Sequence, residues 1–313
     1  MTSPESLTVC VLVLNYNGLA HLDACLSSLL RAAARHGRPC PIVLVDNRST
    51  DESVAFTRTR FPEIEIVVSP SNDFLFSLND VARARREEIV IIVNNDMRFD
   101  EEFVTPLAAH FADADVFAAG AAIFDWSGSS DTVGPRCARV RYCWFDKWWR
   151  CDRQQTSLTF DVCGGAAAYR RRMFVDLDGF DPLYRPGYYE DLDLSYRAWA
   201  RGWRVVYEPG SRAYHKGSVS MLARYGETGM APLMYRNHLL FTVKNVGGLG
   251  FLLGFFLMLP YRVLGPLVRG YSVPLAGFLG AVPLLSLAFR RRFAARDGPL
   301  DITRFETVTP LVR

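Results

Sequence analysis

"IVIIVNND", at residues 89–96, places five β-branched residues directly before two amides and one carboxylate. An unbroken run of Ile and Val predicts a strand that is covered on both faces, as in a parallel sheet. In open sheets of this kind, ligands bind beyond the carboxyl ends of the strands. We therefore expect Asn94, Asn95 and Asp96 to face a ligand site.

The segments around this run alternate between patterns typical of buried strands and patterns typical of helices. Buried strands are predicted over 8–15, 41–47, 63–69 and 88–96, and helices over 19–35, about 50–60 and 78–87. This alternation predicts an α/β fold, a Rossmann-like and mostly parallel sheet with helices on both faces. Ser49 and Glu52 have the spacing of a capping box for the second helix. Residues 125–160 are expected to be irregular.

Composition excludes several classes of protein. The 313 residues are 50% apolar, which is enough for a large core, and a net charge of +3 without a basic stripe gives no indication of nucleic acid binding. Seven Cys without a C-x-x-C pair favour a reducing compartment over a disulfide scaffold or a structural zinc site. "NYNG" follows the first strand where a dehydrogenase would have G-x-G-x-x-G, and a P-loop motif is also missing.

Carboxylates at the predicted strand ends allow two interpretations each. Asp96 could hold Mg²⁺ or Mn²⁺, which prefer oxygen ligands, or it could cap a helix or form a turn with Asn94 and Asn95. Asp46, followed by Asn47, could accept hydrogen bonds from a nucleotide base or ribose, or it could serve as a turn and cap. Both alternatives remain open at this point.

A second candidate lies in "GYYEDLDLSYRAWARGWRVVYEPGSRAYHKGS" (187–218). Its acidic residues open a helix, which simple capping would explain, but three like charges this close should raise the pKa of one of them, as suits a general base. His215 follows the next predicted strand, and it could be structural or could join Asp96 around a cation. Gly164 and Gly165 could let the backbone approach a ligand closely, or they could form an ordinary turn.

Six segments in this order resemble the family 2 glycosyltransferases of GT-A fold, above all the bacterial rhamnosyltransferase-like branch. They are "VLVLNYNG", "VLVDNRSTDES", "IIVNND", "CGGAAAYRRRMFVDLDGFD", "YYEDLDLSYRAWARGWRVVYEPGSRAYHKGS" and "YRNHLLFTVKN". The resemblance covers about residues 7–245. Two positions depart from the family pattern: Asp73 replaces a glycine of N-x-G-F-x-x-x-x-N, and Asn94 replaces the first carboxylate of D-x-D.

The resemblance implies a role for each matching residue. Asp191 is implied to be the catalytic base, Asp96 and His215 are implied to hold the metal, and Gly164, Gly165 and Glu190 are expected at the acceptor and sugar pocket. The residues implied to line the donor nucleotide site are Asn15, Tyr16, Asn17, Asp46, Asn47, Asn72, Asn79 and Asn95.

The function implied is that of a metal-dependent inverting glycosyltransferase, with Mg²⁺ or Mn²⁺ as cofactor. It would move a sugar from a UDP- or dTDP-linked donor to a hydroxyl of a lipid-linked or cell-surface glycan acceptor. A sugar nucleotidyltransferase is an alternative, but it needs a Gly-rich phosphate loop that "NYNGLAHLD" does not supply. A non-catalytic sugar-nucleotide-binding or scaffold protein is a second alternative, because the D-x-D position has lost one carboxylate.

The composition turns apolar after the catalytic segments. We expect a catalytic domain at 1–238 and an apolar helical, membrane-associating region at 239–313. The apolar runs 246–261 and 273–289 are marginal for spanning a bilayer, so they could form a short helical hairpin or lie in the interface with Arg side chains on lipid headgroups. A buried helix pair or a homo-oligomer contact is the alternative. The positive-inside rule places the region at the cytoplasmic face of the cell membrane.

Overall fold

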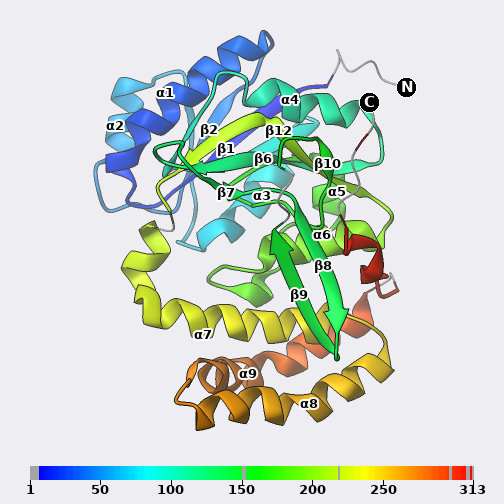
Figure 1. Cartoon of the computed structure of the whole chain (residues 1–313). Helices are drawn as coiled ribbons and strands as arrows, with labels where there is room; N and C mark the ends of the chain where they lie inside the picture. The colour runs from blue at the N-terminus through cyan, green and yellow to red at the C-terminus, as the bar shows by residue number, and fades with distance from the viewer. Residues whose placement is uncertain (1–6, 150–152, 218, 296–297, 308–310, 312–313) are drawn as a thin grey trace.

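The computed structural model describes residues 7–149, 153–217, 219–295, 298–307 and 311. Within these ranges a ten-stranded sheet forms the centre of the molecule, in the order β10-β12-β6-β11-β4-β1-β2-β3, with β5 beside β12 and β7 beside β6 (Figure 1). A separate two-stranded sheet is formed by β8 and β9.

The strands are β1 Val9–Asn15, β2 Ile42–Asp46, β3 Glu65–Val68, β4 Ile89–Asn94, β5 Met97–Phe99, β6 Val116–Asp125, β7 Asp131–Val133, β8 Arg136–Arg141, β9 Trp144–Trp149, β10 Ser157–Leu158, β11 Ala166–Arg170 and β12 Arg204–His215. The α-helices are α1 Leu19–His36, α2 Ser53–Arg60, α3 Ser77–Ala84, α4 Val104–Ala109, α5 Arg171–Asp176, α6 Glu190–Ala200, α7 Val219–Asn245, α8 Leu249–Val268 and α9 Val273–Ala294. Short 3₁₀ turns lie at Phe74–Phe76, His110–Ala112, Pro182–Tyr184 and Ile302–Phe305.

The central strands owe their position to side chains that are apolar on both faces. In β4, Ile89, Ile91 and Val93 join one core with α1 and α4, while Val90 and Ile92 join the other with α3, α5 and α6. All five are at most 1% exposed. Successive side chains of a strand point to opposite faces, so a run without polar residues fits only a strand covered twice. The prediction of an α/β sheet with helices on both faces is confirmed.

Two features of the sheet differ from the expectation. β11 runs antiparallel between β4 and β6, so only part of the sheet is parallel. The region expected to be irregular contains the β8–β9 hairpin. Its two turn residues, Tyr142 and Cys143, both have left-handed φ, of 51° and 52°. Tight hairpin turns of this type usually carry Asn or Gly, so Tyr142 and Cys143 do not indicate a turn.

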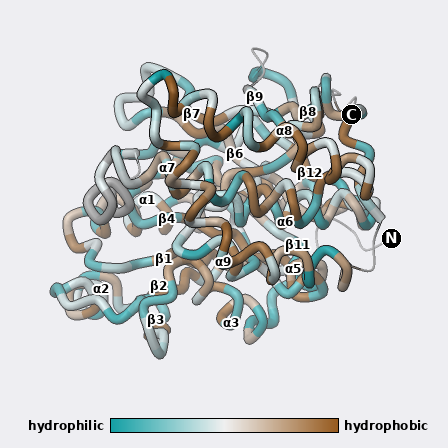
Figure 2. The backbone as a smooth tube through the Cα atoms, turned by 90° about the horizontal axis from the view of Figure 1, so that it is seen from below, coloured by the Kyte–Doolittle hydropathy of each residue, from teal (hydrophilic) through white to brown (hydrophobic). Residues whose placement is uncertain are grey.

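The helices α7, α8 and α9 form a layer below the sheet (Figure 1). Viewed from below, hydrophobic residues run along this layer (Figure 2). Leu239 and Phe241 of α7 and Phe255 of α8 belong to the same core as the lower face of the sheet. The expected domain boundary at 238/239 lies inside α7.

The tip of the β8–β9 hairpin docks on α8. Arg262 of α8 donates to the carbonyl of Tyr142 at 2.5 Å. A Cβ on Gly254 would lie 2.4 Å from Cys143 Sγ, so only a glycine allows this approach. The hairpin therefore connects the sheet domain to the outer helical layer.

Candidate active site

The carboxyl ends of β1, β2 and β4 meet at one edge of the sheet. Asn15 pairs in parallel register with Asp46, and its neighbour Leu14 pairs with Asn94. Parallel strands send their following loops out at the same edge. The strand register thus confirms that the polar residues ending these three strands gather at one rim.

A buried hydrogen-bond network fixes this rim. Asn15 Nδ2 donates to Asp46 Oδ1 at 2.8 Å, and Asn95 Nδ2 donates to Asn15 Oδ1 at 2.6 Å. Ser49 donates its hydroxyl to Asp46 Oδ1 at 2.6 Å and its backbone N–H to Asp46 Oδ2 at 2.9 Å. Fully paired buried polar groups hold a single geometry, so this edge is ordered before any ligand arrives.

Gly18 completes the network by making room for it. A Cβ at this position would lie 1.9 Å from Asn95 Nδ2 and 2.4 Å from Asn15 Oδ1. The φ of Gly18 is −103°, which any residue can adopt, so space alone demands glycine here. The "NYNG" loop is therefore packed directly against the polar rim.

The predicted capping box of Ser49 and Glu52 is wrong. Helix α2 begins at Ser53 with Glu52 as its N-cap, and neither side chain caps it. The Ser49 hydroxyl serves Asp46 instead and also accepts the backbone N–H of Asn17 at 2.9 Å. A buried carboxylate needs hydrogen-bond donors more than an exposed helix end does, because leaving it unpaired costs more.

The loops beyond the rim carry most of the other residues expected at the nucleotide. Tyr16 is 40% exposed, and Asn17 Oδ1 accepts a backbone N–H from the loop after β2 at 2.7 Å. Asn47 Nδ2 donates to the carbonyl of Phe74 at 2.7 Å, and Asn72 Oδ1 accepts the N–H of Phe74 at 3.2 Å. Within the described residues, the buried Asn47 Oδ1 has no hydrogen-bond partner, so it could accept one from a ligand.

Two positions of the N-x-G-F-x-x-x-x-N segment behave unexpectedly. Asp73, where the resemblance expects glycine, has an ordinary φ of −103°, and the left-handed φ of 53° falls on Phe74. Both oxygens of Asp73 accept from Arg185 at 2.6 Å. The Asn79 amide bonds to the backbone of Phe180 at 2.8 and 2.9 Å, so both of its polar atoms are engaged within the protein and take no part in the network at the rim.

Asp96 and His215, the two residues predicted to hold a metal, lie next to each other. His215 pairs with Met97 across the β5–β12 ladder, which brings its Nε2 to 3.1 Å from Asp96 Oδ1. The described residues contain no cluster of three or more His, Cys, Asp and Glu that could hold an ion alone. A carboxylate and an imidazole fit Mg²⁺ or Mn²⁺ that shares its remaining positions with water and substrate phosphate.

Asp191 lies at the start of α6, in a strained setting. Tyr188 and Tyr189 just before it have φ of 69° and 76°, and such backbone strain concentrates at functional sites. Asp191 Oδ1 accepts the N–H of Leu192 at 2.7 Å, and Oδ2 accepts the N–H of Gly164 through a long bond of 3.4 Å. The second oxygen is therefore only weakly held.

Gly164 and Gly165 connect Asp191 to the rim. The carbonyl of Gly165 accepts the N–H of Asn94 at 3.0 Å. A Cβ on Gly165 would lie 2.6 Å from Asn94 Nδ2, so this close approach also needs glycine. Asp191 and Asp96 consequently lie at the same edge of the sheet, separated by the 164–165 turn and the end of β4.

The three carboxylates of α6 have separate environments. Asp193 is fully buried and accepts from Lys244 at 2.6 Å and from Arg197 at 2.7 Å, and these cations hold its pKa well below the usual range against the opposing effect of burial. Glu190 is buried, and its Oε2 has no partner among the described residues. Burial, and secondarily the charge of Asp191, raises the pKa of Glu190. The predicted raised pKa therefore falls on Glu190.

The family pattern described as "Glycosyl transferase family 2" matches residues 10–178 of the chain. The match covers more than half of the sequence and includes Asp46, Asp96 and the turn at 164–165. The chain belongs to glycosyl transferase family 2. Two further residues predicted for the site of this glycosyltransferase, Asp191 of α6 and His215 of β12, lie beyond the matched span.

Curated relatives of this glycosyltransferase include an N-acetylglucosaminyl-diphospho-decaprenol L-rhamnosyltransferase of Mycobacterium tuberculosis. It is 26% identical over 235 residues, which cover 66% of this chain and 75% of the relative.

Solved structures confirm the GT-A fold of this glycosyltransferase. GalNAc-T7, solved with UDP, GalNAc and Mn²⁺, has a TM-score of 0.61 at 14% identity, and the match covers 94% of this chain but 55% of that one. The mannosyltransferase PcManGT of Pyrobaculum calidifontis, solved with GDP-Man and Mn²⁺, has a TM-score of 0.57 at 17% identity, with coverage of 96% and 79%. S. aureus TarS 1–349 in complex with UDP has a TM-score of 0.54 at 16% identity, with coverage of 92% and 89%.

The structure adds residues to the glycosyltransferase's site that the sequence prediction missed. Asp161, which is fully buried, forms an ion pair with Arg136 of β8, and Lys147 of β9 lies 3.8 Å from the same carboxylate. Lys147 also lies 5.0 Å from the ring centre of Tyr189, two residues before the expected catalytic base Asp191. The runs "RCARVR" and "WFDKWW" are each six residues long and are separated by two residues, and the second is rich in aromatic residues; this spacing could have revealed the hairpin.

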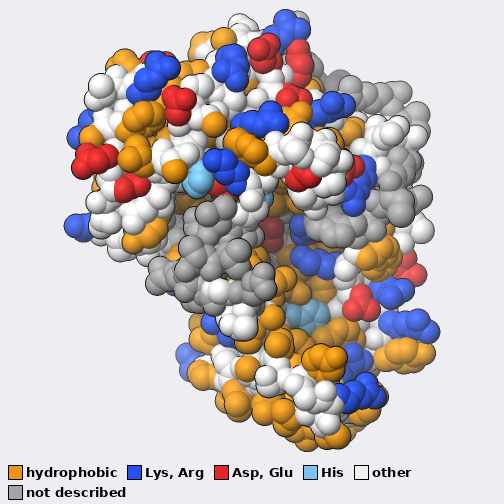
Figure 3. Space-filling view, turned by 60° about the vertical axis from the view of Figure 1, so that its left-hand side comes forward, with side chains coloured by type: hydrophobic (Ala, Val, Ile, Leu, Met, Phe, Trp, Pro, Cys, Tyr) orange, Lys and Arg blue, Asp and Glu red, His pale blue; other side chains and the backbone are white. Residues whose placement is uncertain are grey.

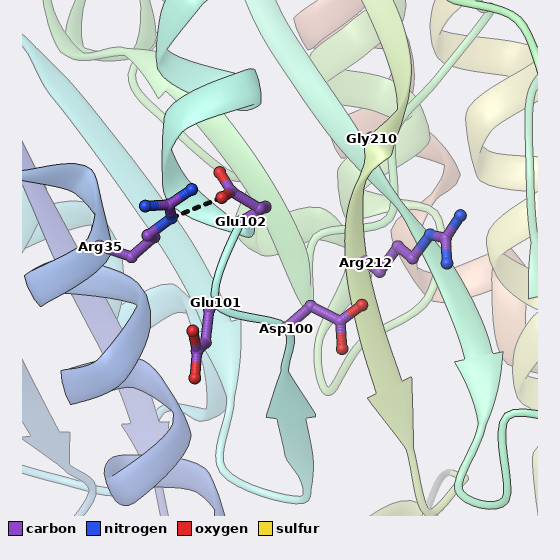
Figure 4. Close-up of a pocket in the computed structure, with 6 residues that line it drawn as sticks. All are labelled: Arg35, Asp100, Glu101, Glu102, Gly210 and Arg212. Atoms are coloured by element: carbon purple, nitrogen blue, oxygen red, sulfur yellow. Dashed lines mark hydrogen bonds and ion pairs between the residues drawn. The ribbon is translucent and has the colours of Figure 1, made fainter.

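A cleft elsewhere on the glycosyltransferase has a different character. It is lined by Arg35, Asp100, Glu101, Glu102, Gly210 and Arg212 (Figure 4). Asp100 follows β5 at the end opposite Asp96, so the cleft lies away from the rim. Its carboxylate Glu102 is half exposed and paired with Arg35 at 2.6 Å. Exposed ion pairs of this kind contribute little stability, and they suggest no chemistry.

Proposed function

We propose that this glycosyltransferase moves a sugar from a UDP- or dTDP-linked donor to a hydroxyl of a lipid-linked or cell-surface glycan acceptor, with inversion at the anomeric carbon. In this proposal, Asp191 is the catalytic base, and Asp96 with His215 holds Mg²⁺ or Mn²⁺. The nucleotide is held at the rim by the residues around Asp46.

The observation that carries the proposal is that Asp191 and Asp96 lie at one edge. Asp191 accepts the N–H of Gly164 at 3.4 Å, and the next residue bonds to the end of β4 two residues before Asp96. The base and the site of the leaving diphosphate must lie on opposite sides of the same sugar. Their common edge supports this arrangement, and the loosely held Oδ2 of Asp191 suits a group that takes up a proton.

The proposed reaction is a single displacement. The acceptor hydroxyl passes its proton to Asp191 as its oxygen forms a bond to the anomeric carbon. The bond from that carbon to the diphosphate breaks, and the nucleoside diphosphate leaves with the electron pair. Attack from the face opposite the leaving group inverts the configuration. A divalent cation on Asp96 and His215 would neutralise the charge that develops on the diphosphate.

The proposed acceptor follows from the relative and from the outer helices. The rhamnosyltransferase relative is named for a sugar-diphospho-lipid substrate, which supports a lipid-linked acceptor here. α8 and α9 are both long and apolar enough to cross a membrane, and only 22% and 17% of their apolar windows are buried in the protein. Such exposure supports membrane association, since soluble surfaces rarely carry large apolar patches.

We propose that α8 and α9 lie along the cytoplasmic face of the membrane. α8 exposes one apolar stripe formed by Leu249, Leu253, Leu257, Tyr261, Leu264 and Val268. Its opposite side, with Phe255 and Leu259, belongs to the core below the sheet. A helix that buries one side in its own domain suits the interface better than the bilayer interior. The exposed Arg269 and Arg290 can meet anionic headgroups, whereas Arg292 donates to the carbonyl of Val243 at 2.9 Å.

The decisive experiment is a transfer assay with a panel of UDP- and dTDP-sugars, Mn²⁺, and a sugar-diphospho-lipid acceptor. Product formation, with the anomeric configuration determined by NMR, tests both the reaction and its stereochemistry. A donor that raises the melting temperature identifies the nucleotide sugar beforehand, because a ligand that binds only the folded state stabilises it. If no donor binds and no product forms across the panel, the proposed reaction is wrong.

A further inference from the structure

Among the described residues, Lys147 has no partner within hydrogen-bond distance. Its side chain is 29% exposed, and its nearest carboxylate, Asp161, lies at 3.8 Å, beyond hydrogen-bond distance. Asp161 is already engaged by Arg136. The Lys147 ammonium also lies 5.0 Å from the centre of the Tyr189 ring. An ammonium has three N–H donors, so this one is available to an anion.

The hairpin geometry directs Lys147 inward. In the β8–β9 register Lys147 pairs with Ala138, which is fully buried, and the neighbouring pair is Arg139 with Asp146. Successive pairs point to opposite faces of the hairpin. Arg139 is 44% exposed and bound to Asp146, so it faces outward. The hairpin thus presents Lys147 and the already paired Arg136 to the interior, near the start of α6, and Arg139 to solvent.

An aromatic path runs from this cation to the outer helices. Tyr189 donates to or accepts from His238 Nδ1 at 3.0 Å, and the His238 ring lies 4.3 Å from Trp144. Trp144 stacks with Phe255 of α8 at 6.0 Å. Figure 3 shows a hollow between the sheet domain and the α8–α9 layer, with basic, His and hydrophobic side chains inside it. Between the proposed base Asp191 and the proposed membrane side, the hollow is therefore lined first by a cation and then by aromatic side chains.

Burial supports the need for an anion here. Removal from bulk water lowers the pKa of Lys147, and the charge of Arg136 lowers it further. His238 remains neutral because burial lowers its pKa to about 3. The imidazole and the aromatic rings between Lys147 and α8 are thus uncharged at neutral pH and suit an apolar chain attached to the anion, and Arg262 of α8 stands at the far end, 4.4 Å from the centre of the Trp144 ring.

We propose that Lys147 binds the diphosphate of an isoprenyl-diphosphate-linked acceptor, with the isoprenyl chain leaving along Trp144 and Phe255 toward the membrane. This inference rests on the proposed function and specifies how its acceptor is recognised. The sugar attached to the diphosphate then lies next to Asp191, where its hydroxyl can lose a proton. The donor diphosphate occupies the separate site at Asp96 and His215.

The test is binding of farnesyl diphosphate to the full chain in mild detergent, with saturating UDP and Mn²⁺ to fill the donor site. Isothermal titration calorimetry should show binding to the wild type and a loss of about tenfold or more in Lys147→Gln, as expected for removal of a charge-assisted contact. Lys147→Arg, which keeps the charge, should restore most of the affinity. The matched control Arg139→Gln removes an outward cation of the same hairpin and should bind as the wild type does.

Two further ligands and one control measurement show what produces the binding seen by calorimetry. Farnesol should bind far more weakly than farnesyl diphosphate to the wild type, a comparison that needs no variant. Inorganic pyrophosphate should bind more weakly but with the same dependence on Lys147. The UDP-induced rise in melting temperature should be equal in the wild type and in Lys147→Gln, which a general structural role of Lys147 would not allow.

Three outcomes would overturn the inference. These are equal binding by the wild type and Lys147→Gln, equal binding of farnesol and farnesyl diphosphate, and displacement of farnesyl diphosphate by UDP, which would place the diphosphate in the donor site. Binding is read without sugar transfer, so the two proposals fail separately. Lys147-dependent binding without any transfer overturns the proposed reaction alone, and transfer with Lys147-independent binding overturns this inference alone.

Discussion

His215 Nε2 lies 3.1 Å from Asp96 Oδ1, although 119 residues separate them in the chain. The antiparallel pairing of β5 with β12 creates this contact, since it places His215 opposite Met97. Both side chains are ligands that Mg²⁺ or Mn²⁺ accepts, and both stand at the carboxyl edge of the sheet, where the fold binds its substrates.

Removal of divalent metal should abolish sugar transfer. We expect a chelator to stop activity and added Mn²⁺ or Mg²⁺ to restore it. His215→Ala should raise the metal concentration for half-maximal activity by about tenfold or more, as is typical when support of a metal site is lost. The control His36→Ala changes a residue that bonds to Thr105 at 3.0 Å, and it should leave this value unchanged. Undiminished activity in chelator would refute the metal assignment.

Asp191→Asn should reduce turnover without disturbing the fold. Loss of a general base typically lowers kcat by about 10²–10⁴-fold. The UDP-induced rise in melting temperature should persist, because Asp191 is not expected to touch the nucleotide. Asp193→Asn provides the contrast: it leaves Lys244 and Arg197 short of a buried partner and should cost about 3–5 kcal/mol of stability. Near-normal turnover in Asp191→Asn would remove this residue from its proposed role.

The sheet was predictable because the apolar sequences of its strands directly indicate that they are buried. Ile89 to Val93 cannot lie anywhere but between two layers, and the polar residues that follow strands such as β4 mark the ligand-binding edge. The parallel register then brings Asn15, Asp46 and Asn94 together without further information. Local pattern and sheet topology were sufficient for this half of the site.

The other half depends on contacts that sequence spacing does not reveal. The β8–β9 hairpin was missed because its turn residues, Tyr142 and Cys143, are unusual there. Both have a left-handed φ, and Asn or Gly usually occupies such positions and makes the turn recognisable in a sequence. Ser49 was assigned to a helix cap because its competing partner, the buried Asp46, is adjacent only after folding. Among the acidic residues of α6, Asp193 pairs with Arg197 four residues later, a spacing visible in the sequence, but its second cation, Lys244, comes next to it only on folding.

Gly18→Ala should weaken both stability and donor binding. The added Cβ would come within 1.9 Å of Asn95 Nδ2, so the network that holds Asp46 must shift. Overpacking of this kind costs about 1–3 kcal/mol, measured as a lower midpoint of urea unfolding. Gly250→Ala, in α8 with no atom within 4 Å of the new Cβ, is the matched control and should be neutral or slightly stabilising. Equal stability of Gly18→Ala and wild type would show that the rim is not packed as described.

Glu190→Gln should change how stability depends on pH. Burial raises the pKa of Glu190 from 4.5 to about 8 in the folded state. The folded state therefore favours the protonated form, so this contribution to stability is complete below pH 4.5 and is lost as pH rises through about 8. Glutamine stays neutral, so the variant should match the wild type in acid and exceed it at alkaline pH by at least about 1 kcal/mol.

Urea unfolding of both proteins across this pH range measures the difference. Other titrating groups are common to the two proteins and cancel in the comparison. A difference between the proteins that does not grow with rising pH would show that Glu190 is ionised in the folded protein.

The outer face of α8 should bind anionic membranes. Leu253 and Leu257 are 65% and 71% exposed and lie one turn apart on the same stripe. Burying each in lipid contributes about 1.5–3 kcal/mol, so the double variant Leu253→Glu/Leu257→Glu should lose flotation with anionic liposomes. The matched control Val68→Glu changes a 51% exposed residue on the edge strand β3 and should float like the wild type. Alkaline carbonate should release the wild-type chain from membranes, since an interfacial helix is held less firmly than a spanning one. Retention after carbonate would instead establish that α8 and α9 span the bilayer, and flotation of the double variant would show that another surface holds the lipid.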